Sequence, residues 1–326
     1  MKNNSSICVV LGAMILLLSA CSNDSIDKQM VDTYDSSSNA ESTIEENQYI
    51  NNSSTAIQED SSEIALADGE VAINSDSFPD EIFREYVESN FDINKDYIFQ
   101  KNELEEVTEI SIYGSNDESL AKIASLSGIE YFENLEILNC ADCCLEDIDV
   151  SANANLKKLN LFNNNLVNID LSQNKALEDL TLGANSIEEL DLSQNYQLKI
   201  LYMLDSPIKN IDISNNIYLE ELCLRNMLLI SIDLSKNTEL IYLDISTNPV
   251  TELDLTANTK LLYLECENTA ISELDLTNNA ELDTLVCRAT NISSIDLSAN
   301  PKISTVVCGT TTEVIGCDES IISRVD

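Results

Sequence analysis

The feature that most constrains this chain is a segment that repeats with a fixed 21-residue period. An Asp, then Val, Leu or Ile, then Ser or Thr recurs without insertion along more than half of the sequence. The Asp residues that begin these recurrences are Asp149, Asp170, Asp191, Asp212, Asp233, Asp254, Asp275 and Asp296. Because one such unit is too short to enclose a core, its apolar side chains leave water only when neighbouring units stack. The period therefore predicts a solenoid.

Each unit also carries a fixed apolar pattern. In the clearest copy, Leu156, Leu159, Leu161, Asn164 and Leu166 spell L-x-x-L-x-L-x-x-N-x-L, which is the leucine-rich repeat signature. The L-x-L part predicts a short strand whose leucines point inward and whose intervening residues line the concave face of a parallel sheet. A 21-residue turn leaves little room for helix. We therefore expect a leucine-rich repeat solenoid of about ten strands over residues 107–326, opened by a weaker copy of the pattern at Val107, Ile110 and Ile112.

Two polar columns accompany the leucines. The outer column is predicted to hold adjacent turns together through side-chain hydrogen bonds to backbone groups. It consists of Asn153, Asn174, Asn195, Asn216, Asn237, Asn258, Asn279 and Asn300. The second column, at the signature Asn position, contains other residue types in several turns. We therefore expect the outer column to supply more of the hydrogen bonds between turns. The residues of the second column are Cys143, Asn164, Asn185, Ser206, Met227, Asn248, Thr269 and Thr290.

The 21-residue repeats, in which Cys sometimes replaces a strand Leu, resemble the cysteine-bearing leucine-rich repeats of the internalin family of bacterial surface proteins. The resemblance covers residues 77–310 and implies a binding protein of the cell surface. Cys140, Cys266, Cys287 and Cys308 occupy the second Leu position of L-x-L, where we expect buried free thiols because the side chains run parallel into the core. Cys140, Cys143 and Cys144 lack a fourth ligand or a second C-x-x-C, which makes a zinc site there a weak alternative.

Charge and composition narrow the function classes. The 326 residues carry 17 Lys and Arg against 58 Asp and Glu, a formal net charge of −41, so we expect no nucleic-acid partner. No His is present, which removes His-dependent nucleophilic pairs and the usual neutral-pH general base. With 7 Gly and no glycine-rich phosphate loop, a nucleotide-binding enzyme is also disfavoured. We expect a protein that is not an enzyme, with an uncharacterised enzyme as an alternative.

The N-terminus resembles a lipoprotein export signal. Residues 7–18 form an apolar run too short to span a bilayer, and Leu18-Ser19-Ala20-Cys21 follows it as a lipobox. We expect a signal peptide at residues 1–20, lipidation of Cys21, and an acidic, disordered tether at residues 21–72. The expected location is the extracytoplasmic face of the cell membrane, reached through a lipid anchor alone.

A single EF-hand-like segment, residues 73–106, precedes the repeats. Residues 79–91 show helical apolar spacing with Ser77 available as a cap, and a second helix holds Leu104 and Val107. The intervening loop matches calcium-ligand spacing, with Tyr97 where a left-handed turn normally requires Gly. The candidate ligands are Asp92, Asn94, Asp96, Ile98, Gln100 and Glu103.

Calcium binding and a purely structural cap over the first repeat both remain open for this segment. The segment resembles the N-terminal cap of internalins, which looks like a truncated EF-hand without a calcium role. This resemblance implies the structural cap. A calcium-dependent structural module of the cell envelope is accordingly an alternative function.

The leading hypothesis is recognition of a protein or glycan ligand by the concave face. Aromatic and apolar side chains at its strand positions form a candidate stripe, and two arginines lie on the same face. These residues are Phe162, Ile200, Tyr202, Leu204, Tyr242, Tyr263, Arg225 and Arg288. The surrounding carboxylates favour a partner with exposed basic groups. The alternative is that these side chains merely decorate the sheet.

Overall fold

The computed structural model describes residues 66–114 and 119–325. The predicted lipobox, Cys21 and nearly all of the predicted tether lie outside these residues. Within them, no helix is long and apolar enough to cross a membrane.

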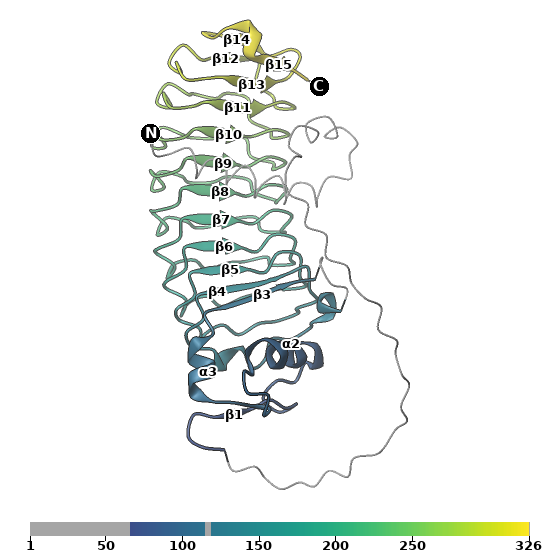
Figure 1. The fold of residues 1–326 in the computed structure, drawn as a ribbon. Helices are drawn as coiled ribbons and strands as arrows, with labels where there is room; N and C mark the ends of the chain where they lie inside the picture. Colours follow the sequence, from purple (N-terminus) through teal and green to yellow (C-terminus); the bar gives the residue numbers. More distant parts are fainter. Residues whose placement is uncertain (1–65, 115–118, 326) are drawn as a thin grey trace, which may run out of the picture. The chain divides into compact units, whose positions relative to one another are not determined.

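A sheet of parallel strands forms the body of the protein (Figure 1). It contains eleven strands, which follow one another in chain order except that β12 and β14 form a separate pair. Its strands are β3 Glu109–Tyr113, β4 Ile137–Ala141, β5 Lys158–Asn160, β6 Asp179–Thr181, β7 Ile200–Tyr202, β8 Glu221–Cys223, β9 Tyr242–Asp244, β10 Tyr263–Glu265, β11 Thr284–Cys287, β13 Thr305–Cys308 and β15 Ile322–Arg324. β12 Ser294–Asp296 and β14 Glu313–Ile315 are parallel to each other. The predicted leucine-rich repeat solenoid with little helix is confirmed.

The strand register follows the 21-residue period. Leu159 pairs with Leu180, which pairs with Leu201, and the same step continues along the sheet. The weak opening copy is confirmed, because Ile110 and Ile112 are fully buried in β3 and pair with Leu138 and Cys140. The first turn, from Ile110 to Leu138, is therefore longer than the turns that follow it.

Leucines fill the interior of the solenoid, and the Leu201 side chain is 0% exposed. The four strand cysteines share this interior and are fully buried, as predicted for Cys140, Cys266, Cys287 and Cys308. Stacked apolar columns of this kind supply the stability that no single turn has alone.

The outer Asn column bridges successive turns as predicted. Asn174 Nδ2, for example, donates to the carbonyl oxygens of Val150 and Asn153 at 2.9 and 3.0 Å. In the second column, Asn185 Nδ2 donates to Leu161 O at 2.8 Å and its Oδ1 accepts from Leu166 N at 3.0 Å. Ser206 interrupts this column, because its buried hydroxyl has no partner among the described residues.

Every turn from β4 to β11 bends through one left-handed residue just after its strand. These residues, with φ between 52° and 59°, are Asp142, Asn163, Ala184, Asp205, Asn226, Thr247, Asn268 and Ala289. Their N–H groups reach the next turn; Ala184 N, for instance, donates to Leu204 O at 2.8 Å. The period alone did not reveal this bend, since none of the residues in the column is glycine.

The segment before the repeats contains α2 Glu81–Phe91, β2 Ile98–Phe99 and α3 Lys101–Glu106, while β1 Val71–Ala72 pairs antiparallel with β2. Both predicted helices are present, but the second ends at Glu106, and Val107, which was predicted to lie within it, is its C-cap. Ser77 is not the cap of α2, because Asp80 Oδ1 accepts from the N–H groups of Ile82 and Phe83 at 3.0 and 2.9 Å. A carboxylate directly before the first turn is a strong N-cap.

Candidate functional site

The candidate recognition surface is the outward face of the sheet, predicted to be its concave face, and it is formed by the residues that flank the buried leucines of β5 to β11. In β7 these residues are Ile200 and Tyr202. The register places Ile200 beside Glu221 of β8, Glu221 beside Tyr242 of β9, and Tyr242 beside Tyr263 of β10. Four strands thus bring apolar, acidic and aromatic side chains into one row.

The predicted ligand-binding residues differ in how far they reach solvent. Ile200, Tyr202, Tyr263, Arg225 and Arg288 are half-buried. Phe162, Leu204 and Tyr242 are buried instead of exposed, at 6%, 5% and 4%. These three members of the candidate stripe therefore offer little surface to a ligand, and the ligand-binding role of the stripe stays a prediction.

The burial has a local reason. Leu204 stands one residue before the left-handed bend and packs over Gly183 of the preceding turn. A Cβ at Gly183 would lie 2.9 Å from Leu204 O and 3.0 Å from Leu204 Cδ2. The ring of Tyr242 lies deep enough that burial raises the pKa of its hydroxyl, which is 3.4 Å from Glu265 Oε1.

Beside this row, two arginines are paired with three carboxylates. Arg225 Nη2 lies 2.9 Å from Glu267 Oε1, and its Nη1 lies 3.8 Å from Asp244 Oδ2 and 3.9 Å from Glu265 Oε2. Arg288 Nε lies 2.6 Å from Glu267 Oε2. Burial raises the pKa of Asp244, and burial followed by the Asp244 charge raises the pKa of Glu265 to about 7. The arginines predicted to meet a ligand are thus already engaged by the protein's own acids.

Glu221 differs from these acids, because it forms no ion pair within the part of the chain that the structure describes. Its Oε2 accepts a hydrogen bond from the Tyr202 hydroxyl. Burial raises the pKa of Glu221, and the negative charges of Asp179 and Glu220 add to that effect. A carboxylate flanked by apolar and aromatic side chains, with no base beside it, is suited to receive a cation from outside.

The sequence prediction invoked the surrounding carboxylates but named none of them, since the residues that it selected are aromatic, apolar or basic. A signal was available, because Asp244 and Glu265 stand one repeat apart at the same register position and Glu221 lies at an outward position of the same sheet. What the sequence did not show is which carboxylates the arginines neutralise.

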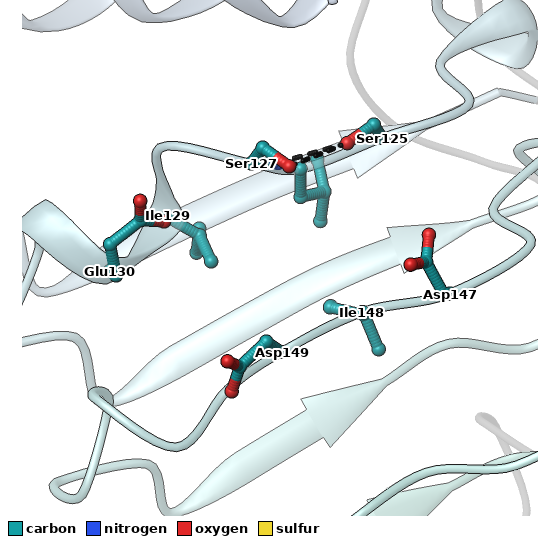
Figure 2. A pocket seen from close by; sticks show the side chains of 8 residues that line it. Ser125, Ser127, Ile129, Glu130, Asp147, Ile148 and Asp149 are labelled. Atoms are coloured by element: carbon teal, nitrogen blue, oxygen red, sulfur yellow. Dashed lines mark hydrogen bonds between the residues drawn. The ribbon is translucent and has the colours of Figure 1, made fainter. Parts of the chain in front are cut away.

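A pocket of about 280 Å³ lies away from this surface (Figure 2). It is lined by Ser125, Leu126, Ser127, Ile129, Glu130, Asp147, Ile148 and Asp149. Several of its polar side chains stabilise turns: Glu130 Oε2 accepts from Gly128 N at 2.8 Å, and Asp149 Oδ1 accepts from Ser151 N at 2.9 Å. Its size is at the lower end of ligand pockets, and we assign it no function.

The EF-hand-like loop holds itself closed with its own acids. Glu103 Oε1 accepts from Ile93 N and Glu103 Oε2 from Gln100 N, both at 2.9 Å. Asp92 accepts from Lys95 N and Tyr97 N at 2.8 and 3.0 Å. The predicted left-handed conformation of Tyr97 is confirmed, with φ 64°.

The remaining predicted ligands bond mainly to each other and to the loop backbone. Asn94 Nδ2 donates to Asp96 Oδ2 and to Gln100 Oε1 at 3.0 and 2.9 Å. Asp96 Oδ1 accepts from the N–H of Ile98, the predicted backbone ligand, at 2.9 Å. Among the described residues no group of three or more acids or cysteines is placed to hold a metal ion. Calcium binding and a purely structural cap both stay predictions for this loop.

No protein-family model and no curated protein matches the sequence. Among solved structures, the functional domain of InlJ from Listeria monocytogenes, which includes a cysteine ladder, is 26% identical over 79% of this chain, with a TM-score of 0.52. Internalin C2 of the same organism is 20% identical over 73% of this chain and 97% of its own, with a TM-score of 0.57. A leucine-rich repeat protein of Leptospira interrogans is 19% identical over 61% of this chain, with a TM-score of 0.56.

The chain spans 63% of the InlJ domain and 57% of the Leptospira protein. The similarities to internalin C2 and to the Leptospira protein establish the fold alone, because so few of the aligned residues are identical. InlJ adds likeness in sequence and a ladder of cysteines, and this chain has buried strand cysteines at four positions. By its repeat, its strand register and its likeness to the InlJ domain, the protein is an internalin-like leucine-rich repeat protein.

Proposed function

We propose that this protein recognises another protein through its concave face, and that the partner presents a basic side chain to Glu221. The observation that carries the proposal is the state of Glu221, a half-buried carboxylate beside Ile200 and Tyr242 with no ion pair among the described residues. Removing a carboxylate from water without a counter-charge is unfavourable, so a Lys or Arg that arrives there would supply the positive charge that the Tyr202 hydroxyl, as a neutral donor, does not.

Several features support binding over catalysis. The buried acids Asp244 and Glu267 are held in ion pairs with Arg225. A rigid sheet that presents adjacent side chains from many strands is suited to a large partner, because each turn adds further contact area. The structural neighbours are leucine-rich repeat proteins as well.

The test is a comparative pull-down from cell-envelope extracts with residues 66–326 immobilised, which keeps the pairing of β1 with β2. Glu221→Lys reverses the charge on the surface, whereas the control Glu220→Lys makes the same change at an exposed neighbour one position away. Proteins retained by wild type and by Glu220→Lys but lost with Glu221→Lys are partners of this face. Equal retention by all three proteins would place the binding surface elsewhere.

The same experiment separates protein from glycan ligands. Digestion of the extract with protease should abolish specific retention, and oxidation of its sugars with periodate should leave retention intact. The opposite pattern would identify a glycan as the ligand.

The second part of the proposal is a lipid anchor at Cys21, supported by the lipobox Leu18-Ser19-Ala20-Cys21. Wild type should partition with membranes and incorporate labelled fatty acid, whereas Cys21→Ser should do neither. Equal labelling of the two proteins would contradict the anchor. A membrane-anchored chain with a long acidic segment would hold its recognition surface away from the lipid.

A further inference from the structure

Two thiols face each other at the end of β4, away from the recognition surface. Cys140 Sγ donates a hydrogen bond to Cys143 Sγ at 3.2 Å, and Cys143 Sγ lies 3.6 Å from Ala141 O. Asp142 between them is left-handed, with φ 59°, and this bend brings residues three apart in the chain side by side. The two cysteines are 0% and 7% exposed, so Cys143 is the member of the pair that borders solvent.

The repeat itself builds this juxtaposition. In the next turns the same two positions hold Leu161 with Asn164 and Leu182 with Asn185, and Asn164 Nδ2 donates to Leu161 O at 3.1 Å. Further along, Thr269 Oγ1 donates to Cys266 O at 2.8 Å in the equivalent arrangement. Among the described turns, the one at β4 is the turn that places a thiol at both positions.

The two thiols are electrostatically unequal. The pKa of Cys143 is lowered chiefly because the Cys140 thiol donates a hydrogen bond to it. The same hydrogen bond, followed by burial, raises the pKa of Cys140. This asymmetry favours thiol–disulfide exchange, because one sulfur ionises and attacks while the second keeps its proton until it resolves the intermediate.

We propose that Cys140 and Cys143 form a redox-active dithiol whose substrates are disulfides, and that it is converted to an intramolecular Cys140–Cys143 disulfide. The Cys143 thiolate attacks one sulfur of a substrate disulfide, forming a mixed disulfide and releasing one substrate thiolate. Cys140 gives up its proton and attacks Cys143 Sγ, which releases the second substrate thiolate. Two electrons pass to the substrate disulfide, and its two sulfurs leave as thiols after taking up two protons.

The test is oxidation of the native full-length chain in mixtures of reduced and oxidised glutathione, followed by acid quenching, alkylation with maleimide under denaturing conditions, and trypsin digestion. Cleavage after Lys122 and Lys157 leaves Cys140, Cys143 and Cys144 in one peptide. Cleavage after Lys260 and Arg288 leaves the stacked pair Cys266 and Cys287 in another, which serves as an internal control. Peptide masses report the state of each pair in the same sample.

We expect the first peptide to appear with a single maleimide and with a mass about 2 Da below that of the free dithiol, the signature of one disulfide. This should occur at a ratio of reduced to oxidised glutathione at least about ten-fold more reducing than any oxidation of the control peptide. Cys144→Ser should leave the conversion intact, and Cys143→Ser should abolish it.

Three maleimides on the first peptide in every mixture would overturn the proposal, as would a stable glutathione adduct without the intramolecular disulfide. Conversion that is lost in Cys144→Ser would assign the disulfide to a different pair and would also overturn it. Oxidation of both peptides at the same ratio would show that the β4 turn has no special reactivity. The first two results and the last are read in wild type and do not depend on whether a variant folds.

Discussion

At the scale of single residues, one left-handed residue follows each strand from β4 to β11, and together these residues form the left-handed column. The strain at each of them sets the conformational cost of its turn. Asn and Asp occupy five positions of the column and tolerate positive φ because their short polar side chains bond locally. Asn163 Nδ2, for example, donates to Asp142 Oδ1 of the preceding turn at 2.8 Å. Thr247 is the β-branched member of the column, with φ 59°, and is therefore the most strained type of residue in it.

Thr247→Asn should raise the free energy of unfolding by about 1 kcal/mol, because the strain of a β-branched residue at positive φ is relieved. The matched control is Thr251→Asn, which makes the same change at an exposed residue outside the left-handed column. Urea denaturation midpoints of the three proteins measure the effect. A midpoint for Thr247→Asn at or below that of wild type would contradict the strain assignment.

At the scale of elements, the polar columns tie one turn to the next. Asn195 Nδ2 donates to Leu171 O and Asn174 O at 3.1 and 2.9 Å, so each outer Asn serves two backbone carbonyls. The second column, at the signature Asn position, is interrupted at Ser206. The Ser206 side chain is too short to make the hydrogen bonds that Asn185 makes one turn earlier. Buried carbonyl groups without donors destabilise the junction between turns.

Asn195→Ala should lower the free energy of unfolding by about 2 to 4 kcal/mol, since two buried carbonyl oxygens lose their donor. Ser206→Asn should raise it by about 1 kcal/mol by extending the run of Asn164 and Asn185 by one turn. The exposed Asn210→Ala is the control. If Asn195→Ala and Asn210→Ala have the same denaturation midpoint, the column does not carry the stability assigned to it.

The cap before the repeats is a second element with a defined interaction. Glu103→Gln removes one of two carboxylate acceptors for the N–H groups of Ile93 and Gln100. We expect a loss of about 1 to 3 kcal/mol in calcium-free buffer, measured by thermal melting, with the exposed Glu106→Gln as control.

Added calcium distinguishes the two roles of this loop. A structural cap predicts that wild type melts at the same temperature with and without calcium. A rise in the melting temperature of wild type that is absent in Glu103→Gln would instead establish calcium binding through this loop.

At the scale of the whole molecule, the excess of acids makes stability depend on pH in two opposite ways. The repeat Asp residues accept hydrogen bonds in their turns, as Asp191 Oδ1 does from Ser193 N at 2.8 Å, and these bonds lower their pKa. Their contribution to stability is present above the ordinary carboxyl pKa and is lost in acid. Glu265 acts in the opposite direction, because its pKa is raised from 4.5 to about 7.

For Glu265 the folded state binds a proton more tightly than the unfolded state. Its contribution is therefore fully present below pH 4.5 and is lost as the pH rises through about 7. The denaturation midpoint of Glu265→Gln relative to wild type should increase between pH 5 and pH 8, whereas the exposed control Glu252→Gln should show no such trend. Parallel curves for wild type and Glu265→Gln over this range would refute the pKa assignment.

Much of this protein follows directly from its sequence. An uninterrupted 21-residue period with leucines at fixed offsets leaves stacking as the one way to bury them, so the strands, their register and the inward column at Leu159, Leu180 and Leu201 are determined locally. The outer Asn column follows for the same reason, since each turn repeats the chemistry of the last.

Only the tertiary structure decided which outward side chains are available. Phe162, Leu204 and Tyr242 are buried, and Leu204 packs over Gly183, which lies one repeat away in the sequence. In the same way, Arg225 reaches carboxylates in the next two turns and leaves Glu221 without a counter-charge among the described residues. These relations depend on distances between side chains of different turns, which a periodic pattern does not contain.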